Sequence, residues 1–286
     1  MNRDEALKRS DDALKELAEA LRQGKSDKLV EYLGMMSRFH QYSFGNCILI
    51  ACQKPDATHV AGFGRWKDLG RFVKKGEKGI AILAPLVGKR SKGEEAQGQP
   101  EQSEATKAKP GKVLYGFRVV HVFDVTQTEG QELPEFASLG GDPGERISRL
   151  EEIIKARGIA IEYVEQLPFD ANGMSEGGKI SIKSTRPKAQ MFSTIVHELA
   201  HELLHWGDRR ESTTKTIRET EAEAVAFVVC KSIGLETSTR ASDYIQLWNG
   251  DEKTLLQSLE HIRTVAAKIL SELEASPEIK EVTHVA

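Results

Sequence analysis

The chain has 286 residues, of which 39% are hydrophobic and 29% are charged, and its formal net charge is −3. These proportions exclude a fibrous or wholly disordered protein, and the length is about twice that of an ordinary domain, so two domains are expected. No apolar run reaches the roughly 18 residues that cross a bilayer, and the first residues lack the apolar segment of a signal peptide. We therefore expect a cytoplasmic protein with no membrane partner. The cysteines at 47, 52 and 230 show no metal-binding or redox spacing.

The first half of the chain predicts helices followed by strands. Apolar residues at helical spacing predict amphipathic helices over 3–22 and 27–39, whereas the apolar segment 43–55 fits a helix or a strand equally well. Glycines precede a strand that begins near residue 80, and strand-like content resumes at 113. Between these strands, residues 89–112 hold almost no apolar side chains and are expected to form a disordered loop. These elements predict an α+β domain over residues 1–135.

The second half predicts one helix, two strands and then a run of helices. Proline and glycine gather between residues 133 and 143, which marks the expected domain boundary. Beyond it, a helix over 144–158 is followed by strands at 159–165 and 178–183. Helices then follow to the C-terminus, including an alanine-rich one over about 216–234. This order predicts a second α+β domain over residues 143–286.

The segment HELAH, from His197 to His201, carries the candidate metal chemistry. Two histidines four residues apart on a helix point the same way and can bind one Zn²⁺ ion together. Glu198 lies between them, where a glutamate acts as a base on the activated water of metallopeptidases. The alternative interpretation is an amphipathic helix whose histidines only pack in the core.

Catalytic zinc takes three protein ligands, so a third ligand is needed. His205 continues the histidine ladder, but eight helical residues rise about 12 Å, which is too far for one ion. We expect His205 to support the site or to face the substrate. The next helix offers Glu219, Glu221 and Glu223, and Glu221 falls among the apolar residues of that helix. Because an inward-facing carboxylate must be paired or bind a metal, Glu221 is the predicted third ligand. The alternative is that all three glutamates are solvated.

Two further features of a hydrolase are only partly defined by the residues. The group that stabilises the oxyanion remains open among Tyr163, Tyr244 and His205. The strand over 179–183 is a candidate edge for pairing with an extended substrate.

Both halves of the chain resemble known families. The segments HELAHELLH and ETEAEAVAF, the latter matched at Glu221, Ala224 and Phe227, are similar to the metallopeptidase domain of the ImmA/IrrE type. This resemblance implies a zincin-like fold, one Zn²⁺ ion (or Mn²⁺) on His197, His201 and Glu221, and Glu198 as the catalytic residue. Residues 42–86 resemble the N-terminal domain of ArdC-type antirestriction proteins. This second resemblance implies that residues 1–135 bind single-stranded DNA.

The segment over 42–86 is also rich in groups that suit a nucleic acid. Cationic side chains can neutralise phosphates, and aromatic side chains can stack on unpaired bases. The candidate DNA-binding residues are Tyr42, Asn46, Arg65, Trp66, Lys67, Arg71, Lys74, Lys75 and Lys78. The alternative is a solvated basic turn whose aromatic side chains pack in the core.

Together the two resemblances imply a DNA-binding zinc endopeptidase with a protein substrate that the residues do not identify, acting in antirestriction or DNA-linked regulatory proteolysis. One alternative is a non-catalytic DNA-binding protection protein in which the metal site is structural. Another is a regulator whose metal domain senses a partner without cleaving it.

Overall fold

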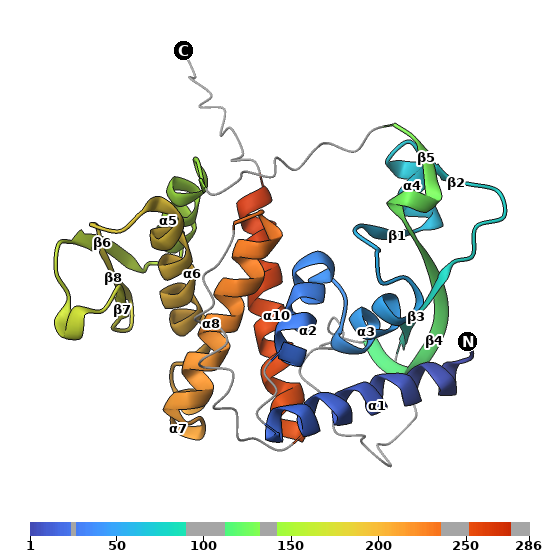
Figure 1. Cartoon of the computed structure of the whole chain (residues 1–286), viewed down its shortest axis with the longest axis horizontal. Helices are drawn as coiled ribbons and strands as arrows, with labels where there is room; N and C mark the ends of the chain where they lie inside the picture. The colour runs from blue at the N-terminus through green and yellow to red at the C-terminus, as the bar shows by residue number, and fades with distance from the viewer. Residues whose placement is uncertain (24–26, 90–111, 132–141, 236–251, 276–286) are drawn as a thin grey trace.

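A computed structural model describes residues 1–23, 27–89, 112–131, 142–235 and 252–275 of the chain (Figure 1). Nearly all of the expected loop over 89–112 lies outside these residues, as do most of the expected domain boundary and Tyr244. None of the described helices combines the length and the apolar character that crossing a bilayer requires. Helices and sheets occur in both halves of the chain, so the mixed α+β class is confirmed.

The N-terminal half consists of helices packed on small antiparallel sheets, as predicted. The segment that fitted helix or strand equally well is helix α3. The elements are α1 (Arg3–Arg22), α2 (Asp27–Phe39), α3 (Phe44–Gln53), β1 (Val60–Gly62), α4 (Phe63–Asp68), β2 (Arg71–Val73), β3 (Ile80–Lys89), β4 (Lys112–Asp124), the 3₁₀ turn η2 (Val125–Gln127) and β5 (Thr128–Gly130). The strand order is β1-β4-β3 in one sheet and β2-β5 in the other, and every pair is antiparallel.

Side-chain hydrogen bonds hold the N-terminal elements together. On α3, the amide of Asn46 accepts from the backbone N–H of Leu83 and donates to its carbonyl, which ties the helix to β3. Asp124 ends β4 as a fully buried carboxylate that accepts from the backbone N–H groups of Thr58 and His59 and from Thr126. Burial alone would raise the pKa of Asp124, but these bonds outweigh it and hold the pKa below its usual value.

The C-terminal half places a small mixed sheet beside a layer of helices. The elements are α5 (Arg146–Ala156), β6 (Ala160–Val164), the 3₁₀ turn η3 (Pro168–Asp170), β7 (Gly173–Ser175), β8 (Lys179–Lys183), α6 (Lys188–Leu204), α7 (Asp208–Ser212), α8 (Lys215–Ser232) and α10 (Glu252–Glu274). In the sheet, β8 lies in the centre, parallel to β6 and antiparallel to β7. The prediction that 179–183 is an edge strand is therefore wrong, because both sides of β8 are already paired.

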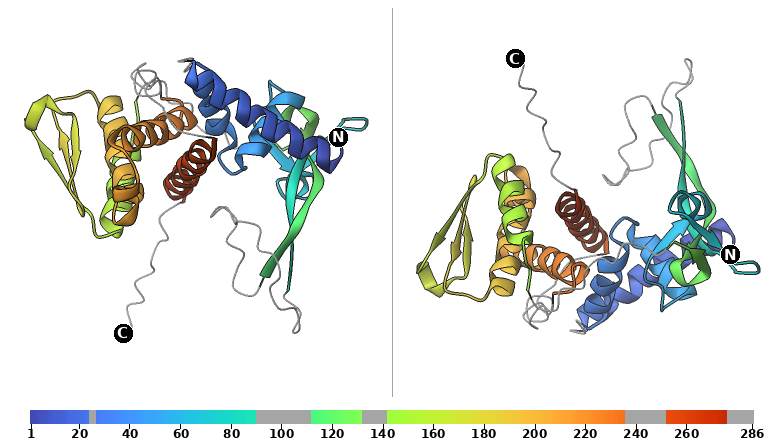
Figure 2. Two further views of the ribbon diagram at one scale, coloured as in Figure 1. Left: turned by 90° about the horizontal axis from the view of Figure 1, so that it is seen from below. Right: turned by 90° about the horizontal axis from the view of Figure 1, so that it is seen from above.

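The two halves share a continuous hydrophobic core. In both views of Figure 2, α8 and α10 lie between the sheet β6-β8-β7 and the N-terminal helices. Buried apolar residues of α2, α8 and α10 belong to one cluster, and the Ser232 hydroxyl donates a 2.6 Å hydrogen bond to the carbonyl of Ser37 on α2. The long axis of the molecule thus runs from β6-β8-β7 at one end to α4, β2 and β5 at the other (Figure 1).

Candidate metal centre

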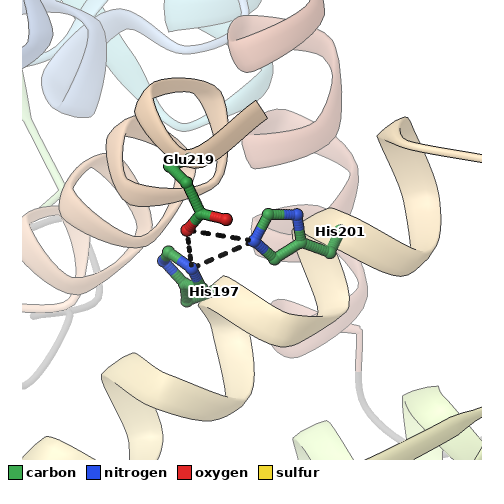
Figure 3. Close-up of side chains that lie close together, drawn as sticks. All are labelled: His197, His201 and Glu219. Atoms are coloured by element: carbon green, nitrogen blue, oxygen red, sulfur yellow. Dashed lines mark hydrogen bonds and ion pairs between the residues drawn. The ribbon is translucent and has the colours of Figure 1, made fainter. Parts of the chain in front are cut away.

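Helices α6 and α8 pack side by side and bring three candidate ligands together (Figure 3). On α6, the Nε2 atoms of His197 and His201 lie 3.1 Å apart. The Oε2 atom of Glu219, on α8, lies 3.6 Å from Nε2 of His197 and 3.7 Å from Nε2 of His201. Two imidazoles and one carboxylate therefore converge on a single point.

The spacing of these atoms fits a small divalent ion. Bonds of about 2.0–2.1 Å at tetrahedral angles place neighbouring ligand atoms roughly 3.3 Å apart, and two imidazoles with one carboxylate form a donor set that suits zinc. The three observed separations, 3.1, 3.6 and 3.7 Å, lie close to that value. The residues thus fit the ion that the sequence predicts, with a different third ligand.

Glu221, the predicted third ligand, lies elsewhere. Its side chain is 0% exposed, and Nη2 of Arg209 lies 2.7 Å from each of its carboxylate oxygens. It also accepts a 2.5 Å bond from the Ser258 hydroxyl of α10 and lies 3.0 Å from Nε2 of His205. The sequence argument correctly placed Glu221 on the buried side of α8 and correctly required a partner for it. The partner is an arginine, so the assignment as a metal ligand is corrected.

The sequence spacing that pointed to Glu221 also fits Glu219. The spacing of glutamate and alanine that pointed to Glu221 and Ala224 also occurs two residues earlier, at Glu219 and Ala222. Helix periodicity put Glu219 on the polar side of α8, and that side faces the histidines of α6. A polar helix face is not a solvent face when the neighbouring helix is also polar there.

Each ligand histidine has an acceptor behind its second ring nitrogen. Nδ1 of His197 lies 3.2 Å from Glu223, and Nδ1 of His201 lies 2.8 Å from Nδ1 of His205. An ionised carboxylate only accepts, so Glu221 requires the proton of His205 on Nε2, and His205 then accepts from His201 through Nδ1. In their neutral forms both histidines are thereby left with a lone pair on Nε2, the atom that faces Glu219. His205 supports the site, as expected.

The electrostatics of the centre follow from these contacts. Burial favours the neutral form of His197, but the hydrogen bonds to Glu219 and Glu223 outweigh it and raise the pKa of His197 to about 10. The same pairing with His197, and then with His201, lowers the pKa of Glu219. Burial raises the pKa of Glu198. For Glu221, burial is outweighed by its donors, His205 first, and the pKa is lowered.

Glu198 lies at the floor of a cleft of about 280 Å³ that opens over the two histidines. Its side chain is 7% exposed, and β7 passes directly over it. At Gly173 on β7, an added Cβ would come within 2.7 Å of Glu198 Oε1 and 2.6 Å of Thr194 Cγ2. A larger residue at this position would require Glu198 or Thr194 to move. Among the described residues β7 pairs with β8 alone, so β7 replaces β8 as the strand edge beside the cleft.

Two of the three candidates for stabilising the oxyanion lie away from the cleft. Tyr163 is on β6, across the sheet from β7, and its hydroxyl donates a 2.6 Å bond to Glu151. His205 is fully buried between His201 and Glu221. Tyr244 lies outside the described residues. Neither described candidate lines the cleft.

The predicted DNA-binding residues divide into buried and exposed sets. Trp66 is 2% exposed, and its indole N–H donates to the carbonyl of Phe123 at 2.8 Å, so it belongs to the core and cannot stack on a base. Asn46 is buried against β3, and the Tyr42 hydroxyl donates to the carbonyl of Val60 at 3.0 Å.

The guanidinium of Arg71 is held by Thr128 and by the carbonyl of Gln131. For Asn46 and Trp66 the structural interpretation replaces DNA contact, whereas Tyr42 and Arg71 are half-buried and their contact with DNA stays a prediction.

The remaining basic residues are exposed and belong to α4 and to the turn between β2 and β3, and these elements lie at the far end of the molecule from α6 and α8 (Figure 1). They are Arg65, Lys67, Lys74, Lys75 and Lys78. Two aromatic side chains of the same region, Phe63 on α4 and Phe72 on β2, are 59% and 54% exposed. Phe63, which the sequence offered as a stacking candidate beside Trp66, and Phe72 therefore expose aromatic faces where Trp66 does not. Their solvent exposure could not be read from the sequence.

Residues 8–123 match the family described as the N-terminal domain of anti-restriction factor ArdC. The first half of the chain therefore contains a domain of this family, as the resemblance of residues 42–86 predicted. The match covers the N-terminal half and does not extend to the metal centre.

More distant similarity covers most of the chain. A Bacillus anthracis protein described as uncharacterized is 25% identical; the match covers 79% of this chain and 44% of that protein, so this chain spans less than half of its relative. The metal-free crystal structure of the antirestriction protein ArdC from plasmid R388 is 20% identical, covers 81% of this chain and 85% of its own, and has a TM-score of 0.48. For the Mn(II)-bound structure of that protein the values are 18%, 82%, 86% and 0.47.

Proposed function

We propose that this protein is a divalent-metal peptidase that also binds single-stranded DNA and acts in antirestriction or in DNA-linked regulatory proteolysis. The observation that carries the proposal is the convergence of His197, His201 and Glu219 beside the buried carboxyl of Glu198, beneath an open cleft. In this proposal residues 1–135 bind DNA and residues 143–286 form a zincin-like domain. Zn²⁺ suits the donor set best, and Mn²⁺ is the alternative.

The arrangement of the chain's own groups suits hydrolysis of a peptide bond. His197, His201 and Glu219 would hold a divalent ion, which would supply a Lewis acid that activates water and polarises a carbonyl. Glu198 accepts the proton of the attacking water and returns it to the leaving amine. The outer edge of β7 offers backbone N–H and C=O groups to an extended substrate, which places the substrate over Glu198.

The open cleft favours catalysis over a purely structural role for the ion. Structural zinc sites are closed by four protein ligands, whereas catalytic sites use three and leave one position for water or substrate. Three side chains converge here, and the cleft of about 280 Å³ opens over them. The alternative, a protection protein with a structural ion, requires no such opening.

The DNA half of the proposal depends on the exposed end of the N-terminal domain. Arg65, Lys67, Lys74, Lys75 and Lys78 can neutralise phosphates, and the exposed rings of Phe63 and Phe72 can stack on unpaired bases. The elements that line the metal cleft, β7, α6, α7 and α8, lie toward the opposite end of the long axis (Figure 1). A single strand and a protein substrate therefore bind at separate places, without competing for one surface.

Metal analysis combined with the Glu198→Gln variant tests the peptidase. The purified protein is expected to bind one equivalent of divalent ion, and Glu198→Gln is expected to retain the ion while losing cleavage of a peptide library. Loss of antirestriction in cells with Glu198→Gln would support proteolysis. Full antirestriction by that variant would instead favour the protection protein.

A labelled single-stranded oligonucleotide, titrated at several salt concentrations, tests the DNA surface. Affinity is expected to fall as salt rises, because each phosphate contact releases counterions. Lys75→Gln and Lys78→Gln together should reduce the salt dependence, whereas Lys268→Gln on α10 is the matched control. Binding that ignores salt would contradict the phosphate contacts.

A further inference from the structure

We propose that the metal cleft selects protein substrates that carry an acidic side chain within one or two residues of the scissile bond. This inference rests on the proposed peptidase function and assigns its substrate class. Three cationic side chains line the cleft around the centre: Arg210 from α7, and Lys215 and Arg218 from the start of α8. Among the described residues that line it, the carboxylates are those of Glu198 and Glu219, which the centre itself uses.

No carboxylate of the described chain neutralises this cationic wall. None of the three side chains forms an ion pair within the described residues. Arg218 is fixed by its Nη1, which donates to the carbonyls of Arg210 and Thr213, and carbonyls leave its charge uncompensated. The guanidinium of Arg210 lies over the ring of Trp206, 5.4 Å from the centroid, which holds it at the cleft.

Lys215 and Arg218 lie near the start of α8, where the helix dipole disfavours positive side chains. A helix N-terminus carries a positive partial charge and normally favours aspartate or glutamate in its first turn. The first turn of α8 contains no acidic residue and begins with Lys215. The local sequence therefore concentrates positive charge at the cleft, where an anionic group of a ligand would be stabilised.

The nearest glutamate of α6 outside the centre is already occupied. The carboxylate of Glu202 accepts from the Ser175 hydroxyl at 2.6 Å and from the backbone N–H groups of Gly177 and Gly178 at 2.9 and 2.8 Å. These bonds direct it to the turn between β7 and β8. Glu202 thus supports β7 beside the cleft and forms no ion pair with the three cationic side chains among the described residues.

The cleft suits an acidic peptide better than a nucleic acid strand. Strand β7 also lines the cleft, and its outer edge can pair with an extended backbone, as peptides provide. Base stacking needs open aromatic faces, and Arg210 lies over the ring of Trp206, which is the one tryptophan, tyrosine or phenylalanine among the described residues that line the cleft. An extended peptide on β7 would direct alternate side chains toward Arg210, Lys215 and Arg218.

Binding and cleavage of matched peptides test this inference. The probes are labelled peptide pools that carry glutamate, glutamine or lysine at the positions that flank a randomised centre. Binding is measured by fluorescence anisotropy on the metal-loaded Glu198→Gln protein, and cleavage on the metal-loaded protein with Glu198 intact. The glutamate pool is expected to bind most tightly and to be cleaved fastest, with a preference that weakens as salt rises.

The cationic residues should carry the preference. Arg210→Gln and Lys215→Gln are each expected to weaken glutamate-pool binding about two- to five-fold, the range of a partly exposed ion pair, and to leave glutamine-pool binding unchanged. Lys268→Gln, which removes an exposed charge on α10, is the matched control and should change neither. Unchanged metal content in the variants would show that the centre itself is intact.

The outcomes separate the two proposals. Cleavage with equal preference for the three pools would overturn the acidic specificity and leave the peptidase in place. Glutamate-selective binding without any cleavage would support the cationic cleft and contradict the peptidase. Neither binding nor cleavage would overturn both.

Discussion

Glu219→Gln and Glu221→Gln are expected to separate metal binding from folding stability. Glu219 faces His197 and His201 and is partly exposed, so its loss removes a ligand while His197 keeps Glu223 as a partner. The stability of the metal-free protein should therefore change by less than about 1 kcal/mol. The metal affinity of Glu219→Gln should fall by more than about 100-fold. A loss of up to about 100-fold is typical of removing a residue that only hydrogen-bonds to a metal ligand.

Glu221→Gln should instead act mainly by lowering the stability of the metal-free protein. Its carboxylate is fully buried and holds Arg209 through two contacts of 2.7 Å. Removing one partner of a buried ion pair typically costs about 3–5 kcal/mol, and because Arg209 is partly exposed we expect the lower end, about 3 kcal/mol. For a chain of this size that corresponds to a Tm lower by roughly 6–12 °C. Metal affinity should fall by about 10- to 100-fold, because Glu221 is the acceptor that orients His205, and His205 in turn orients His201.

Two measurements on the same samples decide which of the two glutamates is the metal ligand. Thermal unfolding of the metal-free variants gives the change in stability, and competition with a chromogenic chelator gives the metal affinity. The reasoning would be refuted if Glu221→Gln lost the ion as completely as a ligand variant while its metal-free Tm stayed unchanged. Glu221 would then be the third ligand, and Glu219 only a neighbour.

Three further predictions concern other parts of the molecule. Gly173→Ala should lose most peptidase activity while keeping its metal, measured as kcat beside metal content, because the new Cβ would lie 2.7 Å from Oε1 of Glu198 and displace it. Asp124, whose folded pKa is lowered, contributes stability that is present above its unfolded pKa and is lost as pH falls through the folded value. Asp124→Asn should therefore lower the free energy of unfolding by about 1–3 kcal/mol at neutral pH, and stability should then fall less steeply below about pH 4. Urea titrations at several pH values measure this, and an unchanged loss of stability at acidic pH would contradict the prediction. Phe63→Ala should weaken single-strand binding and leave the Tm unchanged, whereas Trp66→Ala should cost about 3–5 kcal/mol of stability. Normal oligonucleotide binding by Phe63→Ala would show that this ring does not contribute to the DNA-binding surface.

Local sequence patterns determined most of the helices and the first part of the metal centre. The helices over 3–22 and 27–39 have their predicted bounds, because apolar residues at a 3.6-residue period define a buried stripe without reference to the rest of the fold. His197, Glu198 and His201 belong to one helix, so their relative positions follow from helix geometry alone. The prediction that His205 lies too far along α6 to share the ion, and supports the site instead, rests on the same geometry.

The tertiary structure decided every feature that depends on what a helix or strand faces. Periodicity assigns Glu219 and Glu221 to opposite sides of α8, but it does not say that the polar side meets the histidines and the buried side meets Arg209. Composition likewise does not say that Trp66 is buried while Phe63 is exposed, or that β7, and not β8, is the edge of its sheet. The period of a helix or strand fixes directions within that element, whereas the neighbour in each direction is fixed by packing between segments far apart in the chain.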